Sequence, residues 1–303
     1  MIMNIIISGA FGHIGSFLLN EFQKNDKIKK VLLIDNFLTQ RYSSYLNINK
    51  KKFELIDKDL SEINLNLIKK KYDIFIHLAA ITNAAESFKI KDRLKRNNLG
   101  CTKKVVSFCK KKNIKLIFPS STSVYGKKFE VIDSNNNMQN LFAQSPYAEC
   151  KITEEKLIRK NLKKFIILRL GTIVGKSEGI RFHTAVNKFC YQASLDYPIT
   201  IWKKFYKKKR PYLNLRDCYK VIDYVMFNNS FNKETLDVVT KNYTVEEIVK
   251  IISKFIKVKK KFVNTEILNQ NSYEVLSDKL MKKGLKFSKS ISKDVEQTIK
   301  TLI

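Results

Sequence analysis

The sequence predicts an α/β protein in which a doubly wound parallel sheet is followed by a smaller α+β lobe. In the first half of its 303 residues, short apolar runs alternate with amphipathic stretches, which is typical of βαβ units. A glycine-rich turn follows the first apolar run, and the alternation weakens after Gly175. We therefore expect a first domain over residues 1–175, to which later segments return, and a lobe over residues 176–303 that binds the substrate.

Six apolar runs are expected to form the sheet, and amphipathic stretches between them are expected to be helices. In chain order the strands are Asn4–Ser8, Val31–Asp35, Phe53–Ile56, Ile74–Leu78, Ile114–Pro119 and Phe165–Leu170. The clearest helices are Leu94–Lys111 and Pro146–Lys160. Ser145 precedes the second helix as a candidate N-cap, with Pro146 in the first turn.

Beyond Gly175 the sequence predicts mostly helices with two brief strands. Helices are expected at about Phe182–Leu195, Asp217–Asn228, Val245–Phe255 and Ser292–Leu302, and strands at Ile199–Trp202 and Leu236–Val239. No internal repeat or low-complexity linker separates the two halves, so we expect the lobes to pack closely around a cleft.

The chain is strongly basic, with 58 Lys and Arg against 28 Asp and Glu. Lysine triplets are scattered along the whole chain, which indicates a compositional bias; we expect no specific nucleic-acid partner, only salt-sensitive association with polyanions. No apolar run reaches the about 18 to 20 residues that span a bilayer, so no membrane association is expected and the location is cytoplasmic. The five cysteines lack C-x-x-C spacing, which favours reduced thiols and no metal site.

A G-x-x-G-x-x-G turn, with glycines at 9, 12 and 15, enters a helix directly after the first strand. Such glycines permit a tight turn, close approach of a pyrophosphate and close packing of helix on strand. Asp35 ends the second strand 20 residues after Gly15, where a carboxylate accepts hydrogen bonds from an adenine ribose. It would repel a 2′-phosphate, so NAD is favoured, although Arg41 leaves NADP open.

Tyr147 and Lys151 lie four residues apart on a predicted helix and therefore on one face. This spacing alone is common by chance. It gains weight from Ser121, which follows a strand in the run Ser120–Gly126, and from the glycine turn. Jointly these residues predict an active site.

These residues resemble the extended short-chain dehydrogenase/reductases, the family of nucleotide-sugar epimerases and dehydratases. The resemblance covers nearly the whole chain and includes Asp59-Leu60, His77–Ala80, Asn97–Gly100, Leu168–Gly171 and Arg210–Asp217. It implies a Rossmann-type fold with NAD as cofactor. It also implies that Tyr147 is the general acid/base, that Lys151 holds the nicotinamide ribose and lowers the Tyr147 pKa, and that Ser121 hydrogen-bonds the reacting oxygen.

The resemblance further implies two sets of binding residues. The cofactor would be contacted by Gly9, Phe11, Gly12, His13, Ile14, Gly15, Asp35, Asn36, Asp59, Leu60, Leu78, Ala79, Ala80, Asn97, Tyr147 and Lys151. The substrate would be contacted by Thr82, Ser121, Ser123, Phe182, His183, Asn187, Trp202 and Arg210.

The residues after Ser121 bear on the reaction. Family members that eliminate water carry an Asp-Glu pair there, whereas this chain has Thr122 and Ser123, which cannot exchange a proton near neutral pH. We therefore expect a nucleotide-sugar 4-epimerase acting on a nucleotide-diphosphate sugar. The alternatives are an NAD(P)-dependent keto-sugar reductase or dehydrogenase and, more remotely, a non-catalytic NAD-binding scaffold that associates with RNA. Relatives dimerise through the two long helices, so a homodimer is expected.

Overall fold

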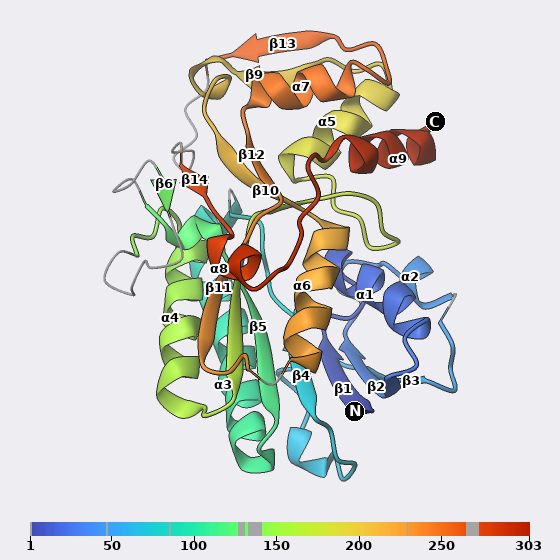
Figure 1. The fold of residues 1–303 in the computed structure, drawn as a ribbon, viewed down its shortest axis with the longest axis vertical. Helices are drawn as coiled ribbons and strands as arrows, with labels where there is room; N and C mark the ends of the chain where they lie inside the picture. The colour runs from blue at the N-terminus through green and yellow to red at the C-terminus, as the bar shows by residue number, and fades with distance from the viewer. Residues whose placement is uncertain are drawn as a thin grey trace.

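A seven-stranded parallel sheet forms the centre of the larger lobe (Figure 1). The computed structural model describes residues 2–46, 48–84, 86–126, 131–132, 141–228, 230–264 and 273–303. The strand order is β11-β7-β5-β4-β1-β2-β3. Their bounds are β1 (Met3–Ser8), β2 (Ile28–Asp35), β3 (Phe53–Asp57), β4 (Ile74–His77), β5 (Lys115–Ser121), β7 (Phe165–Leu170) and β11 (Glu234–Val238). The predicted doubly wound, Rossmann-type sheet is confirmed.

Helices cover both faces of this sheet. Helices α1 (His13–Gln23) and α6 (Leu215–Phe227) pack on one face, and α3 (Lys91–Lys112) and α4 (Pro146–Asn161) on the other; the short α2 (Ser43–Leu46) follows β2. Side chains alternate along each strand, so Ile5 and Ile7 of β1 join the first core and Ile6 joins the second. As expected, Ser145 caps α4, since its Oγ accepts a hydrogen bond from the Ala148 amide at 3.2 Å.

The smaller lobe sits above the carboxyl ends of these strands (Figure 1). Its elements are β8 (Thr172–Val174), α5 (Ala185–Ser194), β9 (Ile199–Trp202), β10 (Arg210–Asn214), β12 (Lys241–Tyr243), α7 (Val245–Ile252), β13 (Lys260–Val263) and α9 (Ser292–Leu302). Strands β12, β10 and β8 form one sheet, and β13 pairs with β9. Strand β14 (Glu274–Val275) pairs with β6 (Val131–Ile132), and α8 (Asp278–Lys282) precedes the last helix.

Two late segments belong to the large sheet and its layers. Strand β11 pairs with β7, and α6 packs against α1, although both follow residue 175. The expected helix from Phe182 instead begins at Ala185, and the one expected to reach Phe255 ends at Ile252. None of the described helices is long and apolar enough to cross a membrane. All five cysteines are buried and unpaired.

Candidate active site

The glycine turn fits tightly between β1, β4 and α1. Gly9 has φ +70°, and a Cβ on it would lie 2.6 Å from the Ala79 amide nitrogen, so another residue would clash with the backbone after β4. A Cβ on Gly15 would lie 2.3 Å from the Ala10 carbonyl oxygen. Gly12 is the N-cap of α1 and provides no side-chain cap, so the first amides of the helix are free for an anion. The turn is therefore suited to hold a pyrophosphate.

Asp35 ties the glycine turn to the loop after β2. Its Oδ2 accepts a hydrogen bond from the Phe11 amide and its Oδ1 one from the Phe37 amide, both at 2.9 Å. Beside it, Asn36 donates to Asp59 at 2.7 Å. Partial burial acts to raise the pKa of Asp59, but hydrogen bonds from Ser61 and Asn36 lower it overall. Two carboxylates thus face the end of the turn where the sequence predicts the adenosine.

The remaining cofactor residues differ in what they expose. Seven of them line a cavity between the two lobes: Gly9, Gly12, His13, Ile14, Gly15, Leu78 and Ala80. Ala79 lies beneath Gly9. The Phe11 ring is buried and stacks on Phe37, with 4.7 Å between ring centroids, and Leu60 is buried in the core under α3. Phe11 and Leu60 therefore offer a ligand mainly their backbone.

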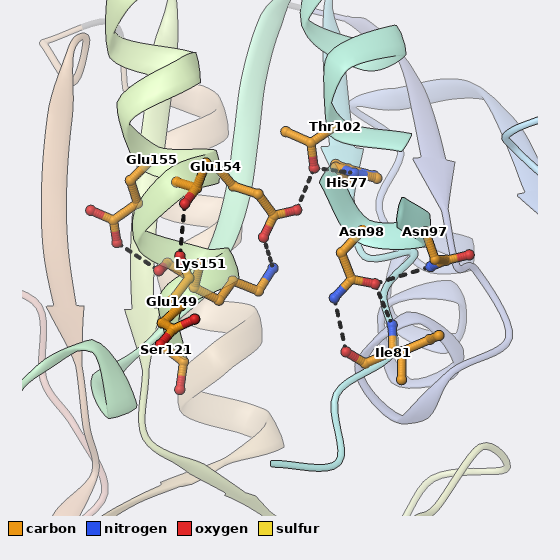
Figure 2. A network of polar contacts seen from close by, with 12 residues as sticks. His77, Ile81, Asn97, Asn98, Thr102, Ser121, Glu149, Lys151, Glu154 and Glu155 are labelled. Carbon is orange, nitrogen blue, oxygen red and sulfur yellow. Dashed lines mark hydrogen bonds and ion pairs between the residues drawn. The ribbon is translucent and has the colours of Figure 1, made fainter. Parts of the chain in front are cut away.

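Asn97, expected at the cofactor, lies on α3 beside Asn98, and Asn98 supports the segment after β4 (Figure 2). Asn98 is fully buried; its Oδ1 accepts from the Ile81 amide at 2.8 Å and its Nδ2 donates to the Ile81 carbonyl at 2.9 Å. Asn97 donates to Asn98 Oδ1 at 3.0 Å. The helical register of α3 turns Asn98 toward the segment after β4, and this clamp holds the cavity wall.

A cavity of about 430 Å³ opens between the two lobes, at the carboxyl ends of the parallel strands. Its wall includes the glycine turn, the segment after β4, Ser120–Ser123, Tyr147 and Lys151, and parts of the smaller lobe. Among the described residues that line it, none is Asp or Glu, whereas five are cationic: Lys151, Arg181, Lys188, Lys208 and Arg210. The cavity therefore favours anionic ligands.

Tyr147 and Lys151 meet on the inner face of α4. The Lys151 Nζ lies 4.3 Å from the centroid of the Phe118 ring, 6.0 Å from that of Tyr147, and 3.3 Å from Glu154 Oε2. Burial raises the pKa of the Tyr147 phenol, and Lys151 acts to lower it. The expected effect of Lys151 is present, but in the protein alone burial outweighs it and the Tyr147 pKa is raised.

Ser121 faces the same cavity from the end of β5. Its Oγ accepts hydrogen bonds from the Ser123 amide at 3.1 Å and from the Ser123 hydroxyl at 2.9 Å. Because both contacts use Ser121 as acceptor, its own hydroxyl hydrogen can be donated to a ligand oxygen.

Five of the residues expected at the substrate line the cavity besides Ser121: Thr82, Ser123, His183, Trp202 and Arg210. Phe182 and Asn187 do not. The Phe182 ring packs beside Tyr191, with centroids 5.1 Å apart. Asn187 is fully buried; it accepts from the Gly175 amide at 3.2 Å and donates to the Arg181 carbonyl at 3.1 Å, so it shapes the loop before α5 instead of facing a ligand.

Arg181 was not predicted from the sequence and lies in the cavity wall. It donates to the Thr82 hydroxyl, while its buried Nε has no hydrogen-bond partner among the residues that the structure describes. Burial and the charge of Arg41 lower its pKa to about 10. No motif surrounds Arg181, so only the folding of residues 175–184 over the glycine turn reveals it. An unpaired buried donor on a cation calls for an anionic ligand.

Residues 5–238 match the family model described as the NAD dependent epimerase/dehydratase family. The chain belongs to this family. The family resemblance inferred from the glycine turn and the Tyr147–Lys151 pair is thereby confirmed, as are the NAD cofactor and the assignment as an NAD-dependent enzyme of the epimerase type. Among the described residues, no group of three or more His, Cys, Asp or Glu could hold a metal ion.

Members of the family include relatives with different reactions. The chain is 28% identical over 250 residues to an uncharacterized UDP-glucose epimerase of Bacillus subtilis, covering 78% of this chain and 76% of that one. It is 33% identical over 202 residues to dTDP-D-glucose 4,6-dehydratase of Dictyostelium discoideum, covering 58% and 45%. In fold it is similar to UDP-glucuronic acid 4-epimerase of Bacillus cereus with UDP-glucuronic acid and NAD, at TM-score 0.86, 23% identity and 99% coverage of both chains.

Proposed function

We propose that this family member is a nucleotide-sugar 4-epimerase. The observation that carries the proposal is a cavity in which Ser121, Tyr147 and Lys151 meet and whose described lining contains no carboxylate. Elimination of water from a sugar needs an acid and a base beside the reacting carbons, and Thr122 and Ser123 supply neither. Exchange of one proton and one hydride at a single carbinol carbon needs no further group.

The site fits a dinucleotide, because the uncapped start of α1, the close approach at Gly9 and the carboxylate of Asp35 match its phosphates and ribose. The bound NAD would supply a reversible hydride acceptor. Tyr147 takes the proton of the sugar hydroxyl and gives it back after the keto sugar has rotated in the cavity to present its other face. Lys151 holds the nicotinamide ribose and favours the phenolate, while Ser121 donates a hydrogen bond to the reacting oxygen.

Cations at the outer end of the cavity suit a nucleoside diphosphate. Lys188, Lys208 and Arg210 line it with Trp202, and the Arg210 guanidinium lies 5.3 Å from the centroid of the Tyr273 ring. Such a side chain pairs well with phosphate oxygens, and Trp202 offers a face for a base. Arg181, deeper in the cavity, would pair with a further anionic group of the ligands.

The proposal is tested by incubating the NAD-loaded protein with UDP-glucose, UDP-glucuronic acid and UDP-N-acetylglucosamine and separating the epimers. One sugar should be inverted without net formation of NADH, and Tyr147→Phe should slow this by about 10²- to 10⁴-fold. Tyr197→Phe, which alters an exposed tyrosine, is the control. Stoichiometric oxidation of added NADH by a keto sugar would instead establish the reductase alternative.

We also propose a homodimer formed through α3 and α4, which pack against each other on one outer layer of the fold (Figure 1). Twofold pairing of these helices would make a four-helix bundle. Light scattering of the purified protein should give twice the chain mass of 35.4 kDa; a monomer mass at micromolar concentration would reject the dimer.

A further inference from the structure

A buried glutamate, Glu154, contacts Lys151 from within the protein (Figure 2). Glu154 lies three residues after Lys151 on α4, and only 1% of it is exposed. Its Oε2 is 3.3 Å from the Lys151 Nζ and makes no hydrogen bond to any other described residue. Its Oε1 accepts a hydrogen bond from the Thr102 hydroxyl of α3 at 2.5 Å.

The hydrogen bonds behind Thr102 run in one direction. Thr102 has one hydroxyl hydrogen, which it donates to Glu154, so its oxygen accepts from the Nε2–H of His77 at 3.1 Å. This assigns His77 the tautomer with a bare Nδ1, which accepts from the Ser8 hydroxyl at 2.7 Å. In this series of hydrogen bonds, every donor points toward Glu154. Such a series stabilises an ionised carboxylate.

Three of the other titratable groups around Glu154, a histidine and two cysteines, are neutral at physiological pH. Burial lowers the pKa of His77 on β4 to about 3 and raises the pKa of Cys101 on α3 to about 11 and that of Cys150 on α4 to about 12. The adjacent Glu155 pairs with Arg169. Glu154 and Lys151 therefore form the charged pair next to the Tyr147 phenol, with Arg181 on its cavity side.

We propose that Glu154 is a positioning residue that holds the Lys151 ammonium and partly cancels its charge, so that Tyr147 stays a weaker acid than Lys151 alone would make it. The inference rests on the proposed function, in which Tyr147 must both take and return a proton. A phenol made too acidic would form a phenolate too weakly basic to take the proton of the sugar hydroxyl readily, although it would return that proton easily. The two steps must be balanced in a reversible epimerase.

The test is Glu154→Gln, which keeps an acceptor for Thr102 and removes the charge. NAD-loaded protein is titrated with base, and the phenolate absorbance of each variant is read against the same variant carrying Tyr147→Phe, so that only Tyr147 is observed. The midpoint should fall by on the order of one pH unit. With a sugar that the enzyme epimerises, the pH profile of kcat/KM should also change. Both its acid and its alkaline limb should move to lower pH, since Glu154→Gln removes a negative charge beside both Tyr147 and Lys151.

Glu149→Gln is the matched control, because Glu149 lies on the same helix but is exposed, 3.9 Å from Lys91. It should leave the midpoint in place. Glu154→Asp keeps the charge at a greater distance and should shift the midpoint less, in the same direction; it replaces Glu154→Gln if that variant does not fold.

A midpoint that stays at the wild-type value in both Glu154 variants would overturn the inference and leave Glu154 a purely structural partner. Retained turnover in Tyr147→Phe would instead reject the proposed function. Loss of turnover in Tyr147→Phe together with an unmoved midpoint in Glu154→Gln would reject only the role of Glu154.

Discussion

Two neighbouring glutamates on α4 lie in buried ionic networks of opposite character. Glu155 is saturated: its Oε1 accepts from the Ser120 hydroxyl at 2.6 Å and from Arg169 Nε at 3.0 Å, and its Oε2 accepts from Arg169 Nη2 at 2.6 Å. Glu154 has one hydroxyl donor and a single contact with Lys151. The Arg169–Glu155 pair is bidentate. In the Lys151–Glu154 pair, the lysine ammonium keeps further hydrogens that it can donate to a ligand.

The difference shows how one helix serves both the scaffold and the active site. Arg169 is 1% exposed and also donates to the Tyr125 hydroxyl at 2.8 Å, which in turn donates to Asp237 at 2.7 Å. These contacts join α4 to β5, β7 and β11 and have no atom in the cavity wall except at Ser120. Lys151, in contrast, lines the cavity and retains donors for a ligand. The buried Arg169 therefore serves the fold, whereas the buried Lys151 can act on a ligand.

The largest expected effect comes from breaking the saturated pair. Glu155→Gln removes the carboxylate that pairs with two nitrogens of the buried Arg169 guanidinium, so the free energy of unfolding should fall by about 3 to 5 kcal/mol. Urea denaturation followed by circular dichroism measures this. Glu296→Gln, which breaks an exposed pair with Lys300 on α9, should cost less than about 1 kcal/mol. A loss as small for Glu155→Gln as for Glu296→Gln would remove the distinction between the two networks.

This contrast also marks the boundary of what the sequence could predict. The glycine turn and the Tyr147–Lys151 spacing are local patterns, so their positions are readable along the chain. Which of two adjacent asparagines faces the segment after β4 depends on the register of α3, and for that reason the sequence did not reveal that Asn98 clamps Ile81. Glu154 looks like any helix glutamate until α3 brings Thr102 to it.

The smaller lobe was the harder part to predict, for a related reason. Strands β8, β10 and β12 are short, and each pairing joins residues roughly 30 to 40 positions apart, as in Tyr212 with Thr172 and Arg210 with Tyr243, so no alternation reveals them. The family resemblance placed Phe182 and Asn187 at the substrate, but folding keeps both out of the cavity wall and places Arg181 in it. In contrast, Trp202 and Arg210, chosen on the same kind of argument, do line it.

A smaller effect is expected at the far end of the saturated network. Tyr125→Phe removes the hydroxyl that accepts from Arg169 and donates to Asp237, and leaves both partners one contact short. The free energy of unfolding should fall by about 1 to 3 kcal/mol. Turnover measured below the melting range should stay within about twofold of wild type, since the Tyr125 hydroxyl does not face the cavity. A large loss of kcat without loss of stability would place Tyr125 with the active-site network.

A further expected effect separates the two networks by pH. Of the three histidines, none lies in the network around Glu155, and two are buried: burial lowers the pKa of His13 to about 4 and that of His77 to about 3, from 6.5. The unfolded chain binds these protons first, so the stability is complete above pH 6.5 and is lost as the pH falls toward 4. Each histidine contributes about 1.4 kcal/mol per pH unit in that window. Asp294, whose pKa burial raises to about 6, offsets part of the loss.

Comparing His13→Gln with wild type removes the contribution of Asp294, because that group is common to both. His13 Nε2 lies 2.7 Å from the Gly175 carbonyl, and a glutamine amide can donate there in its place. The variant should match wild type within about 1 kcal/mol at pH 7.5 and become the more stable protein by pH 5, as urea titrations at both pH values would show. If the free energy of unfolding falls equally in both proteins between pH 7.5 and pH 5, the acid sensitivity does not arise from His13. The two networks would then not differ in their dependence on pH.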